Sequence, residues 1–214
     1  MTQAKGHFIV LEGMEGAGKS TLLQLIKQHL VSMGLEVVCT REPGGTRVGE
    51  AARQLIKEPC PDEALDSRAE LLLLYASRVQ LIERVIRPAL ARGAWVLADR
   101  FELSTWAYQG GGRKLDPEFM QQLSRFSLQG FAPDVTFFLD LPPELGLQRV
   151  QQGRGVFDRI EQESLPFFHA VYEAYHEALK KLSKVIMIDA RQALPQVQQA
   201  VLAQLQHYLT SSAQ

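Results

Sequence analysis

Residues 7–23 read HFIVLEGMEGAGKSTLL and join a short apolar run, a glycine-rich segment and the start of a helical pattern. Within them GMEGAGKS, residues 13–20, matches the phosphate-binding pattern G-x-x-x-x-G-K-[ST], the P-loop. Its glycines let backbone N–H groups point at phosphate oxygens, and the following helix adds its positive N-terminal end. The order strand, loop, helix is the context that this motif requires. The stretch therefore predicts a site for a nucleoside triphosphate.

Two side chains at the end of the loop carry the chemistry of this site. Lys19 supplies a positive charge for the β- and γ-phosphates, and Ser20 supplies a hydroxyl for Mg²⁺. The residues that we expect to contact the nucleotide here are Gly13, Met14, Glu15, Gly16, Ala17, Gly18, Lys19, Ser20 and Thr21.

Five short apolar runs, at 7–12, 36–40, 94–99, 135–141 and 184–189, are predicted strands. Most are apolar on both faces, which is typical of a sheet covered on both sides. Segments with helical periodicity lie between them, at 19–33, 66–91, 116–129, 143–152, 161–182 and 194–209. Strands that alternate with helices predict an α/β P-loop NTPase fold, a five-stranded parallel sheet with helices on both faces. No linker divides the sequence, so we expect a single domain over residues 1–214.

The composition excludes several classes of protein. A hydrophobic content of 46% argues against disorder, and a net charge of −1 gives no global positive field for nucleic acid or an anionic membrane. The apolar runs are far shorter than the roughly 20 residues that span a bilayer. Cys39 and Cys60, with no secretory pattern at the start of the sequence, read as reduced thiols. We expect a cytoplasmic protein without nucleic-acid or membrane partners.

Two arginine-bearing segments follow the second predicted strand. In REPGGTRVGEAAR, residues 41–53, Arg41 and Arg53 bracket a Pro-Gly-Gly turn that can approach a ligand or be an ordinary surface turn. In ELLLLYASRVQ, Leu74 and Arg78 are four residues apart and share one helix face. Arg78 can hydrogen-bond the edge of a planar ring that packs on the apolar residues, or it can extend into solvent.

The third predicted strand ends in Asp99, at a place where a carboxylate can hold Mg²⁺ through water. Five residues that can donate, accept or stack follow within ten positions: Arg100, Ser104, Thr105, Tyr108 and Gln109. Ligands collect at the carboxyl ends of strands in such sheets, so this stretch predicts a second binding site.

The segment LQRVQQGRGVFDRIEQE, residues 147–163, carries Arg149, Arg154 and Arg159 around two glycines. Alone it reads as a solvated loop or as a hinged basic flap. The variable P-loop positions contain no cation, so an arginine from elsewhere must neutralise the transferring phosphate. This favours a small basic lid at about 150–160.

A P-loop occurs in kinases, GTPases and ATPases alike. The guanine-reading pattern N-K-x-D is absent from the sequence, and several arginine-bearing loops indicate transfer to a second, anionic substrate. A deoxynucleoside kinase or another nucleotide kinase is one alternative, although a nucleoside acceptor needs a base and not three arginines. A P-loop switch or binding module is an alternative of another class, and it leaves the residues after Asp99 without a role.

The motifs EG-x-EGAGKS, REPGGT, DRF…S…AYQG and GR…DRIEQE occur in this order and resemble the bacterial thymidylate kinase family over roughly residues 7–209. The resemblance implies phosphorylation of dTMP to dTDP with MgATP, which serves dTTP synthesis, by a homodimer. It implies catalytic roles for Lys19, Asp99, Arg100 and Arg154, with Ser20 and, indirectly, Asp99 at the metal. It implies a dTMP site of Glu15, Arg41, Pro43, Arg53, Leu74, Arg78, Arg100, Ser104, Thr105, Tyr108 and Gln109.

Within that implied site, Arg41, Arg53 and Arg100 hold the acceptor phosphate, and Arg78, Thr105 and Gln109 read the thymine edge. Tyr108 packs against the sugar, Glu15 lies near the 3′-hydroxyl, and Arg149 and Arg191 lie near adenine. Leu74 departs from the family, which commonly has a phenylalanine four residues before the base-reading arginine. We also expect Trp106 to pack in the core and Gly110–Gly112 to let the chain leave the site.

Overall fold

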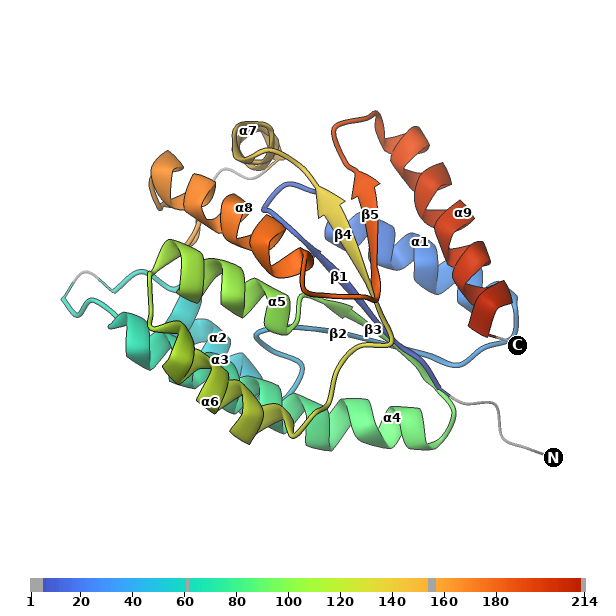
Figure 1. Cartoon of the computed structure of the whole chain (residues 1–214), viewed down its shortest axis with the longest axis horizontal. Helices are drawn as coiled ribbons and strands as arrows, with labels where there is room; N and C mark the ends of the chain where they lie inside the picture. Colours follow the sequence, from blue (N-terminus) through green and yellow to red (C-terminus); the bar gives the residue numbers. More distant parts are fainter. Residues whose placement is uncertain (1–5, 61, 154–156, 213–214) are drawn as a thin grey trace.

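The computed structural model describes residues 6–60, 62–153 and 157–212. At its centre is a sheet of five parallel strands in the order β2-β3-β1-β4-β5, as predicted (Figure 1). The strands are β1 (Phe8–Gly13), β2 (Val37–Arg41), β3 (Trp95–Asp99), β4 (Val135–Asp140) and β5 (Val185–Asp189). The outer strands β2 and β5 are only partly buried, because each has a neighbouring strand on one side.

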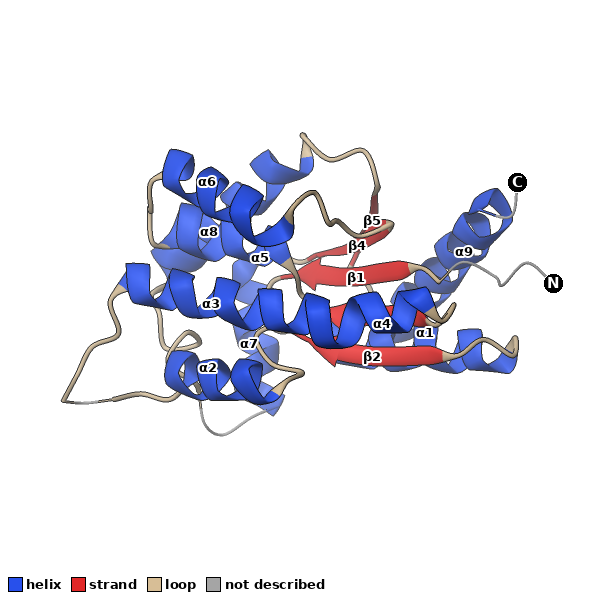
Figure 2. Ribbon diagram, turned by 90° about the horizontal axis from the view of Figure 1, so that it is seen from below, coloured by secondary structure: helices blue, strands red, loops and turns tan. Residues whose placement is uncertain are grey.

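Helices cover both faces of the sheet because successive strand residues point to opposite sides. Ile9 and Leu11 pack beneath α1 (Lys19–Ser32) and α9 (Leu194–Ser212), whereas Phe8 and Val10 pack against the opposite layer. That layer includes α3 (Ser67–Leu81), η1 (Ile82–Ile86) and α4 (Arg87–Ala91), which run on from one another (Figure 2). The remaining helices are α2 (Arg47–Lys57), α5 (Glu102–Thr105), η2 (Trp106–Gly112), α6 (Pro117–Leu128), α7 (Pro143–Gly153) and α8 (Leu165–Leu179).

The helices α2 and α8 differ from the sequence prediction, and so do α5 and η2, which lie where no helix was predicted. A Pro-Gly-Gly turn was expected after the second strand, but no helix behind it; α2 begins directly after that turn, capped by Thr46, whose hydroxyl accepts from the Gly49 N–H at 3.0 Å. The helix expected at 161–182 begins instead at Leu165, with Ser164 as its cap and Pro166 in its first turn. Both starts follow from capping residues, which satisfy the free N–H groups of a first turn.

We expected the glycines at 110–112 to let the chain leave the site. Instead they are part of the helical turn η2. They let η2 pack closely on α8. A Cβ on Gly111 would lie 2.4 Å from Cβ of Ala174, and one on Gly112 would lie 2.4 Å from the ring of Phe167. Trp106, expected in the core, is half-buried at the edge of a small apolar cluster.

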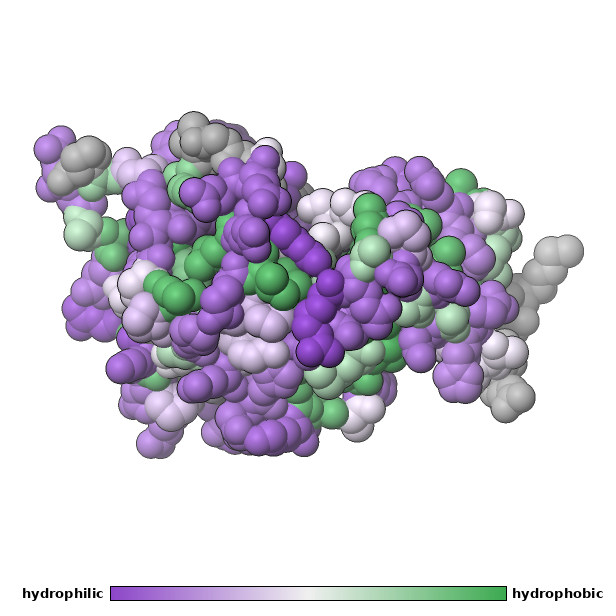
Figure 3. Space-filling view, turned by 90° about the horizontal axis from the view of Figure 1, so that it is seen from above, coloured by the Kyte–Doolittle hydropathy of each residue, from purple (hydrophilic) through white to green (hydrophobic). Residues whose placement is uncertain are grey.

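Figure 3 shows a face on which hydrophilic residues predominate and hydrophobic ones lie between them in small groups. In the described ranges, none of the helices combines the length and the apolar character that crossing a membrane requires.

Candidate active site

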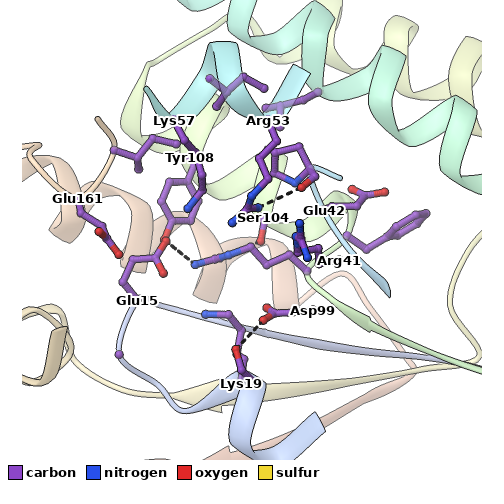
Figure 4. Close-up of a pocket in the computed structure, with 18 of the residues that line it drawn as sticks. Glu15, Lys19, Arg41, Glu42, Arg53, Lys57, Asp99, Ser104, Tyr108 and Glu161 are labelled. Atoms are coloured by element: carbon purple, nitrogen blue, oxygen red, sulfur yellow. Dashed lines mark hydrogen bonds and ion pairs between the residues drawn. The ribbon is translucent and has the colours of Figure 1, made fainter. Parts of the chain in front are cut away.

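A cavity of about 460 Å³ lies at the carboxyl ends of β1 and β3. It extends from the P-loop to α2 and α3, and Figure 4 shows Lys19 and Asp99 across it from Arg53 and Lys57. The predicted site residues that line it are Glu15, Gly16, Gly18, Lys19, Ser20, Thr21, Arg41, Pro43, Arg53, Leu74, Arg78, Asp99, Arg100, Ser104, Thr105, Tyr108, Gln109 and Arg149. One cavity thus brings together residues from five separate segments of the sequence.

The P-loop places a buried cation at the start of α1. Lys19 Nζ donates to the carbonyl oxygens of Gly13 at 3.1 Å and Met14 at 2.9 Å. Gly18 has φ 89°, in the left-handed region that glycine adopts without strain, and it lets the loop turn into the helix. Burial and the nearby Arg100 charge lower the pKa of Lys19, while Glu15 and Asp99 oppose this shift.

Ser20 and Asp99 form a pair of oxygen groups beside the loop. Ser20 Oγ donates to Asp99 Oδ2 at 3.2 Å. The described residues contain no group of three or more carboxylate, histidine or cysteine side chains that could enclose a metal ion. Mg²⁺ generally keeps several waters and takes one or two protein ligands together with substrate phosphates, so this donor pair fits it.

Arg100 is the most heavily bonded cation of the cavity. Its Nη1 donates to Ser104 Oγ at 3.0 Å and to the Tyr175 hydroxyl at 2.9 Å, and its Nη2 donates to the Tyr108 hydroxyl at 3.2 Å. Nη2 also lies 2.8 Å from Oε1 of Glu15. Burial raises the pKa of Glu15, but the charges of Arg100 and nearby lysines outweigh it and hold that pKa at about 2.

Sequence reasoning missed Glu12, which supports Arg100 from below. This fully buried carboxylate accepts from the backbone N–H groups of Phe101 at 2.8 Å and Ser104 at 3.2 Å, and from two hydroxyls. The hydroxyls are Ser104 Oγ at 2.5 Å and that of Tyr175 at 3.2 Å. Arg100 itself has φ 71°, which an arginine adopts only when its surroundings enforce it. An acid at the end of an apolar run was the available signal.

The opposite end of the cavity is built around Arg78, of which only 1% is exposed. Its Nε donates to Glu42 Oε2 at 2.7 Å, and its Nη2 donates to Thr105 Oγ1 at 2.8 Å. Nη1 is buried without a hydrogen-bond partner among the described residues. Burial raises the pKa of Glu42 to about 7, although the charge of Arg78 opposes the shift. Leu74 lines the same end and provides an aliphatic wall.

Two cations on α2 face the P-loop across the cavity. Arg53 and Lys57 are four residues apart and therefore share one helix face. Arg53 Nη1 donates to the Pro43 carbonyl at 3.0 Å, and burial together with the Arg41 charge lowers its pKa. Arg41 forms an exposed ion pair with Glu50 at 2.8 Å. The excess of positive charge makes this wall suited to an anion.

The residues expected near adenine separate in the structure. Arg149 lines the cavity and donates to the Ala190 carbonyl at 3.0 Å. Arg191 lies on the exposed surface, paired with Asp189 at 2.8 Å, and is not among the lining residues. Gly13, Met14 and Ala17 of the P-loop are likewise not among the residues that line the cavity. Arg154 falls outside the described residues, so the central part of the expected lid is not placed.

Arg159, the last of the three arginines in the segment 147–163, holds that segment in place. It donates to the Ile56 carbonyl at 2.7 Å and pairs with the buried Glu70, and these contacts fix the residues around Arg159 against α2 and α3. The cavity is lined further by Glu42, Ile56, Lys57, Phe101, Val150, Gly153, Ile160 and Glu161. Lys57 follows Arg53 by one helical turn and would have been found had α2 been predicted.

Comparison with known proteins assigns this site to a family. A family model described as Thymidylate kinase matches residues 11–201. A thymidylate kinase of Legionella pneumophila strain Corby is 52% identical over 209 residues, which cover 98% of each chain. One from strain Paris is 51% identical with the same coverage. The chain therefore belongs to the thymidylate kinase family and phosphorylates dTMP to dTDP with ATP.

Proposed function

We propose that the chain transfers the γ-phosphoryl group of ATP directly and in line to a dTMP phosphate oxygen, with no covalent enzyme intermediate. One observation carries the proposal: a single cavity joins the P-loop cation Lys19 to the cationic wall of Arg41, Arg53 and Arg100. The two anionic substrates can therefore meet without transfer through a protein nucleophile. A nucleotide phosphate is already ionised, so the reaction needs no strong general base.

The acceptor phosphate is held by Arg41, Arg53 and Arg100. These guanidinium groups come from β2, α2 and the turn after β3, so they approach the anion from different directions. Arginine suits this role because its planar group binds two phosphate oxygens at once. A nucleoside acceptor has no phosphate that would use this wall.

The base and sugar occupy the opposite end. Arg78, Thr105 and Gln109 read the thymine edge, beside Pro43 and above Leu74, whose aliphatic side chain replaces an aromatic stacking partner. Tyr108 packs against the deoxyribose and crowds a ribose 2′-hydroxyl. Tyr75 does not take the stacking place, because its hydroxyl donates to Glu102 at 3.1 Å and its ring packs in another cluster.

Mg²⁺ supplies charge neutralisation on the phosphates when it is bound with ATP. Ser20 Oγ is the direct protein ligand in this proposal, and Asp99 lies behind it and acts through water. Glu15 orients Arg100 and lies near the 3′-hydroxyl. Arg149 and Arg191 flank adenine, with Arg191 at the edge of the surface.

The lid, residues about 150–160, closes over the phosphates within a single domain that spans 1–214. Arg154 then provides the cation that the P-loop lacks at its variable positions. Closure excludes water and limits wasteful hydrolysis of ATP.

We place the enzyme in the cytoplasm as a homodimer. Cys39 and Cys60 are free thiols, which suits a reducing compartment. Leu72 of α3 and Phe126 of α6 are 51% and 78% exposed, and these two helices contact each other. Such exposed apolar side chains suit a second copy of the chain. The test is the molecular mass of the parent protein and of Phe126→Asp, measured by light scattering. We expect the mass of a dimer for the parent protein and a larger share of monomer for the variant.

The direct transfer is tested with ATP made chiral at its γ-phosphoryl group by oxygen isotopes and sulfur. A single in-line displacement inverts the configuration in the product. Net retention would require two displacements and a covalent intermediate, and it would overturn the proposal. Arg53→Met should also raise the KM for dTMP far more than the KM for ATP.

A further inference from the structure

A buried carboxylate outside the cavity wall contacts one of the base-reading residues. Gln109 Nε2 donates to Glu70 Oε1 at 2.7 Å, and both side chains are buried. Gln109 lines the cavity, whereas Glu70 of α3 lies behind it. The amide is therefore held from its outer side, by a group that no substrate reaches.

Glu70 can only accept at this position. On its far side the carboxylate is paired with Arg159, and Arg113 Nε lies 3.4 Å from Oε1. Both carboxylate oxygens of Glu70 therefore already accept from guanidinium groups. With its oxygens acting as acceptors, the group of Gln109 that faces Glu70 is the donor nitrogen Nε2 and not the amide oxygen.

In a planar amide, the direction of the NH₂ group fixes the direction of the oxygen. With Nε2 of Gln109 on Glu70, the polar atom left for the cavity is Oε1, and no described residue donates to it. Arg78 Nη1, also unpaired among the described residues, offers a donor at the same end. The site thus offers one donor and one acceptor, which match O4 and N3–H of thymine.

We propose that Glu70 is a positioning residue that fixes the polarity of the Gln109 amide and so selects a pyrimidine protonated at N3. The proposal rests on the proposed reading of thymine by Gln109 and Arg78. A buried site that hydrogen-bonds one substrate rejects an analogue with a reversed group strongly, because both polar groups are then left unpaired.

We expect the substitution Glu70→Gln to reverse the orientation of the Gln109 amide. Arg159 is a charged donor and takes the single carbonyl oxygen of the new amide in preference to the neutral Gln109. The new NH₂ group then faces Gln109, whose amide must turn and present Nε2 to the cavity. That donor suits an unprotonated N3.

The test compares dTMP with 5-methyl-2′-deoxyisocytidine monophosphate, which keeps O4 as an acceptor but has an unprotonated N3. We expect Glu70→Gln to lower the ratio of kcat/KM for dTMP to that for the analogue by about tenfold or more. Arg113→Met, which removes another partner of Glu70, should leave the ratio unchanged. In a Gln109→Met background the ratio is already low, and Glu70→Gln should change it no further.

The outcomes separate the two proposals. If the parent protein prefers dTMP but Glu70→Gln keeps its ratio, the role of Glu70 is wrong while the proposed function stands. If the parent protein does not prefer dTMP to the analogue, the reading of thymine by Gln109 fails as well.

Hydrogen exchange of the Gln109 side-chain amide tests the proposal in the parent protein, even if the Glu70→Gln variant does not fold. The side-chain NH₂ of Gln109, assigned by its loss in Gln109→Met, should exchange slowly with solvent and remain so when dTMP binds. Fast exchange in the free protein or in the complex would overturn the proposal, because it would show that Nε2 is not held by Glu70.

Discussion

Arg100 Nη2 and Glu15 Oε1 lie 2.8 Å apart, so the turn after β3 and the P-loop are joined by an ion pair at the centre of the cavity. The same guanidinium donates to Ser104, Tyr108 and Tyr175. Its position is thus set on both sides before any phosphate arrives, which is the preorganisation that transfer between two anions requires.

Arg100→Lys should keep the charge and lose the activity. A lysine cannot make the forked set of bonds, and each hydrogen bond to a charged group contributes about 1.5–3 kcal/mol. We expect kcat/KM for dTMP to fall by about 10²–10³-fold in steady-state assays. A value close to that of the parent protein would show that charge alone suffices at this position.

Arg154→Ala tests the lid. The P-loop has no cation at its variable positions, and Arg159 is occupied by Glu70. We therefore expect kcat to fall by about 10³-fold, as for other arginines that act on a transferring phosphate, with little change in dTMP binding. Arg68→Ala is the control, because Arg68 is exposed and paired with Asp66 away from the cavity. An unchanged kcat in Arg154→Ala would remove the lid from the mechanism.

Glu12→Gln should weaken both the fold and the reaction. The amide keeps one acceptor oxygen, but an NH₂ group replaces the other. This NH₂ group would face hydroxyl and N–H groups that donate to Glu12 in the parent protein, so donor would meet donor. Leaving such groups unpaired reduces the free energy of unfolding by about 1–3 kcal/mol, measurable by urea denaturation. The kcat should fall too, since Arg100 loses its support; full activity at reduced stability would limit Glu12 to a structural role.

Glu42 gives the stability a pH dependence of known sign. Its pKa is about 7 in the folded protein against 4.5 for the unperturbed group, so its stabilising contribution is complete below pH 4.5. That contribution is lost as the pH rises to about 7, at up to about 1.4 kcal/mol per pH unit. Relative to Glu42→Gln, the parent protein should therefore lose stability between these pH values. A constant difference in unfolding free energy would contradict the shift.

Gly111→Ala and Gly110→Ala form a matched pair within η2. A Cβ at Gly111 would lie 2.4 Å from that of Ala174, whereas one at Gly110 would meet only the flexible Met120 at 3.6 Å. We expect the first variant to lose about 1–3 kcal/mol of unfolding free energy, as overpacked cores do, and the second to change little. Equal values for the two would show that η2 and α8 separate easily.

Much of the fold was predictable because the central strands are continuous apolar runs that end at marked residues. The P-loop, Asp99 and Arg100 could be placed at one edge of the sheet for the same reason. The missed helix α2 begins after a Pro-Gly-Gly turn, and its cap Thr46 lies inside a segment that reads as a loop. Local sequence favours the turn, while packing on α3 decides where the helix runs.

The sequence does not predict the roles of residues that hold other site residues in place. Glu12 and Tyr175 are 163 positions apart, yet their carboxylate and hydroxyl meet beneath Arg100. Glu70 reads as one more charged residue at the start of a helix, and only the fold brings Gln109 and Arg159 to it. Such contacts depend on the register of α3, η2 and α8, which no spacing in the sequence specifies.

In this protein one cavity accepts dTMP and receives the phosphoryl group of ATP. The most direct test measures initial rates of ADP formation with MgATP and each of dTMP, dUMP, dCMP, CMP, AMP and GMP at equal concentrations. We expect rapid ADP formation with dTMP and far slower formation with the cytosine and purine nucleotides. Equal rates with dTMP and with CMP or AMP would contradict it.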